Sequence, residues 1–194
     1  GGRHPLPTAA AFAEWASAAG VGPGTLVVGY DAGSGWASRL WWLLRHFGHE
    51  DAAVLELGCW RGSLRPGAEE IAPAQFVARE RTDDTASAEE LLARLGDAGL
   101  VLLDARAPER YRGEVEPLDR VAGRIPGARN LPFQQAFPPP AELLAADELV
   151  VYCGSGVTAC VDVLALTLAG RADARLYPGS WSEWSALGFP VEKG

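Results

Sequence analysis

The sequence predicts an α/β protein: a parallel β-sheet flanked by helices, in two tandem copies of which the first is incomplete. Short β-branched and apolar runs alternate with segments of helical length, as in parallel sheets. Loops that contain glycine, at 31–35 and 153–158, each join a strand to a helix. The chain also aligns with itself at an offset of 122 residues, which places Tyr30-Asp31 on Tyr152-Cys153 and Gly48 on Gly170.

The first half of the chain begins with a helix. Thr8 is a suitable N-cap for a helix that runs to about residue 19, and Gly20 supplies the stop. A strand over 26–30, a helix over 36–47 and a strand over 53–57 follow. Because the chain lacks methionine and opens on Gly1, we expect an N-terminal truncation that removes the opening half of the first copy and any targeting peptide.

The second half repeats the alternation. Ser87 and Glu90 form a capping box for a helix over 87–95, followed by a strand over 100–104 and a helical turn over 107–112. A strand over 149–152, a helix over 157–169 and a strand over 175–177 come next. A second capping box, Ser180 with Glu183, opens the last helix. We predict domains over 1–64 and 86–194, joined by a proline-, glycine- and charge-rich linker over 65–85.

Composition excludes several classes of function. The 194 residues are 48% apolar and 22% charged, as in ordinary globular proteins. The net charge of −8 argues against nucleic acid or an anionic membrane as a partner. Three irregularly spaced cysteines favour reduced thiols and a cytoplasmic setting. The histidines do not group with them at zinc spacing, so neither a metal nor another cofactor is expected.

The loop that begins at Cys153 is the candidate for chemistry. Cys153 ends an apolar strand, and Gly154 and Gly156 allow the backbone to curl before the next helix begins. In such a unit the loop amides and the helix N-terminus face the crevice at the carboxyl end of the strand, which suits an anion. The loop is therefore suited to stabilising a sulfur anion. The alternative is a buried structural cysteine, the commoner fate of a free thiol.

The loop sequence Cys-Gly-Ser-Gly-Val-Thr-Ala, over 153–159, resembles the active-site loop of the rhodanese superfamily, specifically its mercaptopyruvate sulfurtransferase branch. The resemblance implies a rhodanese-like sheet and a Cys153 nucleophile that accepts sulfur as a persulfide and passes it to a second thiol. The persulfide would be held by loop amides. The candidate binding residues in this loop are Gly154, Gly156, Val157 and Thr158, and Thr158 is also a candidate helix cap. The implied partners are a small sulfur donor and a thiol, cyanide or thioredoxin acceptor.

Two arginines are candidates for gripping a donor carboxylate. Arg110 lies in a segment, 109–113, that resembles the family segment with this task, and a guanidinium matches a carboxylate bidentately. The family's second such arginine falls on Asp119 here, with Arg120 beside it. Arg120 is therefore a candidate substitute, and the departure leaves open a different donor.

His4 matches a family histidine that forms a Ser–His–Asp proton relay, with Ser155 as the serine and an aspartate expected upstream of Gly1. In the segment 124–128, Arg124 replaces a family histidine, and we expect that segment to hold the fold together with Asp104 and Arg106. The first copy carries Asp31 where the second carries Cys153, so we expect it to be catalytically silent.

Three alternatives remain for comparison. Protein tyrosine phosphatases need an arginine six positions after the cysteine to hold phosphate. That position is Ala159 here, so phosphatase activity is not expected. Thiosulfate is the alternative donor, although the thiosulfate branch typically carries basic residues at the positions of Gly154 and Ser155. A non-catalytic binding module of the same fold is the third. Cys160 and Cys59 are expected to be structural.

Overall fold

The computed structural model describes residues 1–63, 66–67 and 69–194, which form two compact units. The N-terminal unit comprises Leu6–Thr82, and the C-terminal unit comprises Gly1–Pro5 with Asp83–Gly194. The α/β class is confirmed. The units divide the chain differently from the predicted domains, because residues 1–5 pack with the C-terminal unit and residues 71–82 with the N-terminal one. Position 64, the last of the predicted first domain, and positions 65 and 68 of the predicted linker lie outside the described residues.

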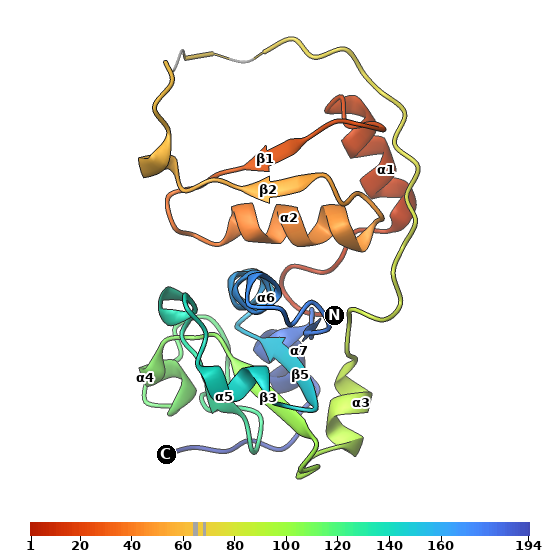
Figure 1. The fold of residues 1–194 in the computed structure, drawn as a ribbon. Helices are drawn as coiled ribbons and strands as arrows, with labels where there is room; N and C mark the ends of the chain where they lie inside the picture. Colours follow the sequence, from red (N-terminus) through yellow and green to blue (C-terminus); the bar gives the residue numbers. More distant parts are fainter. Residues whose placement is uncertain (64–65, 68) are drawn as a thin grey trace. The chain divides into compact units, whose positions relative to one another are not determined.

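The N-terminal unit pairs two parallel strands with two helices (Figure 1). Its elements are α1 (Ala9–Ala18), β1 (Val27–Gly29), α2 (Trp36–His46), β2 (Ala52–Val54) and the 3-10 helix η1 (Leu57–Cys59). The expected cap of α1 is confirmed, since Thr8 Oγ1 accepts a hydrogen bond from the Ala11 amide at 3.2 Å. Gly20 ends the helix region with φ of +75°, where side-chain-bearing residues are strained.

Part of the predicted linker belongs to the core of this unit. Phe76 is buried and packs edge-on against Phe12 at 5.5 Å between ring centroids, while Phe12 stacks on Phe47 at 4.6 Å. The Ala74 amide donates to the carbonyl of Ser17 at 2.9 Å. Burying a phenylalanine stabilises the fold by about 1.5–3 kcal/mol. The polar, glycine-rich sequence around Phe76 does not indicate that this residue is buried. The segment around Phe76 is therefore packed structure.

The C-terminal unit is built on four parallel strands in the order β4-β3-β5-β6. Its strands are β3 (Leu100–Asp104), β4 (Arg129–Asn130), β5 (Glu148–Tyr152) and β6 (Arg175–Leu176). Its helices are α3 (Ala88–Ala93), α4 (Pro108–Tyr111), α5 (Ala141–Leu144), α6 (Ala159–Leu168) and α7 (Ser180–Ala186), with the 3-10 helix η2 (Phe133–Gln135). Figure 1 shows β3 beside β5. The elements β4, η2 and α5, each of four residues or fewer, are not predicted by the sequence pattern.

Strand β5 occupies the middle of this sheet. Leu149, Val150 and Val151 have no exposed surface, as expected of a strand covered on both faces. Register pairs Asp104 with Tyr152, so β3 and β5 end side by side, directly before Cys153. Within the described part of the chain, no helix is long and apolar enough to cross a membrane.

Candidate active site

The loop after β5 folds around the sulfur of Cys153. Cys153 is 2% exposed, and the Gly156 amide donates to its Sγ at 3.2 Å. Gly156 has φ of +79°, and a Cβ there would lie 2.5 Å from the Pro178 carbonyl oxygen. Only glycine fits this position, so the predicted curl is confirmed at Gly156.

The start of the loop is fixed by a residue that sequence reasoning assigned elsewhere. Ser180 Oγ accepts a hydrogen bond from the Cys153 amide at 3.1 Å and donates to the Tyr177 carbonyl at 2.9 Å. The predicted capping box of Ser180 with Glu183 is therefore wrong. Gly179 is the N-cap of α7, and Ser180, whose hydroxyl binds the Cys153 amide, has an unusual φ of 53°. No local sequence pattern reports such a long-range contact.

Thr158 occupies the N-cap position of α6 without capping it. Its backbone is helical and its side chain makes no capping hydrogen bond. The expectation that Thr158 caps the helix is thus wrong, and the first helical residue is Ala159, two residues later than predicted. Val157 is buried and Thr158 half-buried beside the loop.

Residues 1–5 bring His4 to the loop. His4 Nδ1 lies 2.8 Å from Ser155 Oγ, a hydrogen-bonding distance. Ser155 is only 8% exposed, whereas His4 is exposed, so the contact lies at the edge of the buried loop. The two candidate relay residues, 151 positions apart in sequence, are therefore direct neighbours.

The side chain of Arg110, in α4, also lies beside the Cys153 loop. A Cβ at Gly154 would lie 3.4 Å from both Nη1 and Nη2 of Arg110, so this glycine leaves room for the guanidinium. Arg110 also pairs with Glu116 at 2.7 Å. Burial opposes the ionisation of Glu116, but hydrogen bonding and the charge of Arg110 prevail and hold the pKa of Glu116 below its usual value. The guanidinium is thus oriented by a buried carboxylate.

A third arginine, Arg3, lies at Gly154 and was not anticipated. Arg3 Nη2 is 3.2 Å from the position of a Gly154 Cβ and 3.5 Å from the Gly154 carbonyl oxygen. Arg3 pairs through Nη1 with Asp119, the residue at the position of the family's second arginine. Arg120, the predicted substitute, is exposed. An aspartate at position 119 could have suggested a basic partner, but the sequence does not indicate that this partner is Arg3.

The other two cysteines have different surroundings from Cys153. Cys160 is buried and donates its thiol to the Gly156 carbonyl at 3.3 Å, while Cys59 is exposed in the N-terminal unit. Two residues further along α6, Asp162 is fully buried, and neither carboxyl oxygen has a hydrogen-bond partner among the residues described. Burial and, secondarily, the negative charge of Cys153 raise the pKa of Asp162 well above its usual value.

The residues expected to hold the fold do so. Arg106 is 2% exposed, binds Asp104 at 2.6 Å and donates to the Gly123 carbonyl at 2.7 Å. Arg124 pairs with Glu192 and covers the ring of Tyr111 at 4.4 Å. These arginines are committed to buried or partly buried structural partners.

The loop between β1 and α2 of the N-terminal unit contains its own anion, the Asp31 carboxylate. The Asp31 carboxylate accepts hydrogen bonds from the amides of Gly33 at 2.7 Å, Ala37 at 2.9 Å and Ser34 at 3.2 Å. Burial opposes its ionisation, but these donors prevail and lower the pKa of Asp31. The strand–loop–helix–strand order β1–α2–β2 matches β5–α6–β6. In one unit three loop amides bind a carboxylate, and in the other the Gly156 amide binds a thiol.

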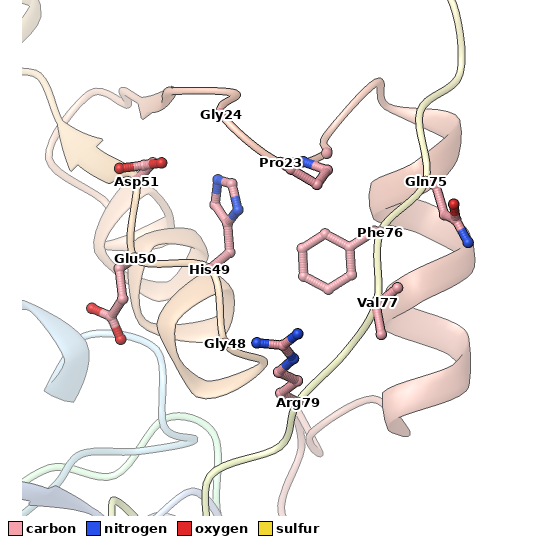
Figure 2. Close-up of a pocket in the computed structure, with 11 residues that line it drawn as sticks. Pro23, Gly24, Gly48, His49, Glu50, Asp51, Gln75, Phe76, Val77 and Arg79 are labelled. Atoms are coloured by element: carbon pink, nitrogen blue, oxygen red, sulfur yellow. The ribbon is translucent and has the colours of Figure 1, made fainter.

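A separate pocket of about 390 Å³ lies within the N-terminal unit (Figure 2). His49 and Phe76 face it, and Glu50, Asp51 and Arg79 contribute charges of both signs. The ring of His49 is anchored by Nε2 to the Thr25 carbonyl at 2.8 Å. The pocket's lining includes no cysteine, so the candidate for sulfur chemistry remains the Cys153 loop.

The chain is similar to known proteins over most of its length. The family model of the rhodanese-like domain matches residues 87–187. A probable 3-mercaptopyruvate sulfurtransferase of Pseudomonas aeruginosa is 45% identical, over 94% of this chain and 72% of that protein. A putative thiosulfate sulfurtransferase, SseB, of Mycobacterium tuberculosis is 39% identical, over 95% of this chain and 72% of that protein. The crystal structure of SseA from Escherichia coli, described as a 3-mercaptopyruvate sulfotransferase, aligns with a TM-score of 0.76 and 32% identity, over 92% of this chain and 75% of that one.

Proposed function

This chain belongs to the rhodanese-like family of sulfurtransferases, and we propose that it moves a sulfane sulfur from 3-mercaptopyruvate to a thiol or cyanide through a persulfide on Cys153. The observation that carries the proposal is the Cys153 loop, in which the Gly156 amide donates to the sulfur and two guanidinium groups lie at Gly154. A sulfur anion and an anionic donor both fit this arrangement.

The first half-reaction forms the persulfide. The Cys153 thiolate attacks the sulfur of 3-mercaptopyruvate, an S–S bond forms, and the donor's C–S bond breaks. The electrons of that bond leave with carbon as pyruvate enolate. Hydrogen bonding from the Gly156 amide, which lies 3.2 Å from Cys153 Sγ, stabilises the sulfur anion as an oxyanion hole stabilises oxygen.

We assign the proton transfers of this step to His4 and Ser155. The donor thiol loses one proton and the enolate carbon gains one, so no net proton is needed. His4 takes the proton that the donor thiol loses, the Ser155 hydroxyl gives its own proton to the enolate carbon, and His4, 2.8 Å away, returns a proton to Ser155. Pyruvate then leaves, and the persulfide remains on Cys153.

The second half-reaction returns the free enzyme. A thiolate or cyanide attacks the outer sulfur, the S–S bond to Cys153 breaks, and the products are a new persulfide or thiocyanate and the Cys153 thiolate. Because the three cysteines are free thiols, we propose a reducing, cytoplasmic setting in which a small thiol or thioredoxin is the acceptor.

We also propose that the two units descend from tandem copies, of which residues 1–64 are the silent one and 86–194 the catalytic one. The matching order of elements and the self-contained Asp31 loop support this. Asp31 has no thiol that could accept a sulfur atom, and its carboxylate already binds the loop amides.

The test compares two buried cysteines, Cys153 in the loop before α6 and Cys160 within α6. After treatment with 3-mercaptopyruvate, intact mass and peptide mapping should show one added sulfur on Cys153, and cyanide should release it as thiocyanate. Cys153→Ser should abolish both signals, while Cys160→Ser, the matched control, should retain most of them. Persulfide on Cys160, or no persulfide with either 3-mercaptopyruvate or thiosulfate, would refute the proposal. The second outcome would favour a non-catalytic binding module.

Thiosulfate is the second candidate donor, because the relative from Mycobacterium tuberculosis carries that name and Asp119 departs from the family pattern. Side-by-side values of kcat/KM for the two donors decide between them. We expect 3-mercaptopyruvate to be preferred, since Gly154 and Ser155 bring no charge into the loop itself.

A further inference from the structure

We propose that Arg3 supplies, together with Arg110, the cation that binds the donor's carboxylate, and so determines which donors bind. The proposal rests on the proposed function and names a substrate-binding residue that neither the sequence pattern nor the family segment around Arg110 provides. Arg3 lies in residues 1–5, which pack with the C-terminal unit.

The two guanidinium groups converge on one backbone position. The nearest atoms to a Cβ built on Gly154 are Arg3 Nη2 at 3.2 Å and the two terminal nitrogens of Arg110 at 3.4 Å. Gly154 directly follows the nucleophile Cys153. Any side chain at 154 would crowd this pair, so the glycine is explained by the space that two arginines need beside the reacting sulfur.

Asp119 holds these like charges together. It pairs with Arg3 through Oδ1, and its Oδ2 lies 3.9 Å from Arg110 Nη2. Its side chain is 9% exposed, and Oδ2 has no hydrogen-bond partner within the described part of the chain. The carboxylate therefore orients Arg3 as Glu116 orients Arg110. A guanidinium has five N–H donors, and the contacts of Arg3 to Asp119 and Gly154 leave donors for a second carboxylate.

Arg3 takes the role that the family pattern gives to an arginine at position 119. The pattern places a cation at position 119, where this chain has an anion, and the anion recruits a cation from position 3. The positive charge beside the loop is thus preserved, although it comes from a different segment. Arg120 does not fill this role in the structure, because it is exposed.

The test measures donor kinetics and, separately, binding of pyruvate, a carboxylate that carries no transferable sulfur. Arg3→Ala should raise KM for 3-mercaptopyruvate about ten- to a hundredfold, as expected for one lost charged hydrogen bond, with a smaller change in kcat. Pyruvate affinity, measured by calorimetric titration, should fall by a similar factor. Arg112→Ala, which removes an exposed arginine paired with Glu114, should change neither.

A double variant controls for the possibility that loss of the Arg3–Asp119 ion pair detaches residues 1–5 from the C-terminal unit. Arg3→Asp combined with Asp119→Arg keeps the ion pair and moves the cation to position 119, so KM and pyruvate affinity should return to within a few-fold of wild type. Unchanged pyruvate affinity in Arg3→Ala, a loss confined to kcat, or an equal KM increase in Arg120→Ala would overturn the proposal. Because pyruvate binding needs no sulfur transfer, this proposal can fail or stand independently of the Cys153 reaction.

Discussion

Asp162 offers a direct test of how this fold tolerates a buried acid near Cys153, the proposed nucleophile. The side chain has no exposed surface, and both carboxyl oxygens lack hydrogen-bond partners among the described residues. Burial first, and then the negative charges of Cys153 and Asp104, raise the pKa of Asp162 well above its usual value. The folded protein therefore holds this carboxyl protonated over a pH range in which the unfolded chain ionises it.

The sign of the pH dependence follows from proton binding. Where the folded state binds one proton more than the unfolded state, stability falls as pH rises, at up to about 1.4 kcal/mol per pH unit. The stabilisation from the protonated form is complete below the usual pKa of Asp162 and is lost as pH rises toward the raised value. Asp162→Asn has nearly the same shape and no ionisation. Its stability should equal that of wild type near pH 4 and exceed it increasingly toward neutral pH.

A second substitution separates charge from polarity. Asp162→Val removes the unsatisfied oxygens as well as the charge, and each such buried polar group costs about 1–3 kcal/mol. Asp162→Val should therefore be more stable than Asp162→Asn by a constant amount of this size at every pH. For a chain of this length each kcal/mol corresponds to roughly 2–4 °C in Tm.

The assay is thermal unfolding of wild type and variants between pH 4 and pH 8. The control is Asp147→Asn, the same substitution at an exposed site, which should leave the pH profile of Tm unchanged. The reasoning is refuted if the gap between Asp162→Asn and wild type stays constant with pH. It is also refuted if Asp162→Val is less stable than wild type throughout, because the carboxyl must then have a partner worth more than its burial costs.

Three further predictions concern the two loops. His4→Gln should lower kcat for 3-mercaptopyruvate by about 10²- to 10⁴-fold, the usual contribution of a proton-transfer group, and a normal kcat would remove His4 from the relay. Gly156→Ala should destabilise the C-terminal unit by roughly 1–3 kcal/mol, because φ is +79° and the new Cβ would lie 2.5 Å from Pro178 O; chemical denaturation measures this, and neutrality would show that the loop relaxes. Asp31→Asn should destabilise the N-terminal unit at neutral pH. Because the pKa of Asp31 is lowered in the fold, that difference should shrink as pH falls through the lowered pKa, and a difference independent of pH would contradict the role of its charge.

The sequence by itself determined the α/β class, the order of the main strands and helices, and the Cys153 loop. Strands and helices reveal themselves through local periodicity, and the loop is a contiguous run whose glycines have local backbone reasons, as the φ of Gly156 illustrates. Thr8 and Ser87 cap their helices as predicted, because a cap depends on residues three positions away.

Only the tertiary structure decided which distant groups surround that loop. The Ser180 hydroxyl binds the Cys153 amide instead of capping its own helix, and Arg3, absent from any local motif at the loop, lies at Gly154. Phe76 joined the core from a stretch that reads as a linker. The physical reason is common to all three: long-range hydrogen bonds, ion pairs and burial depend on where the sheet brings segments together, and sequence periodicity carries no record of that placement.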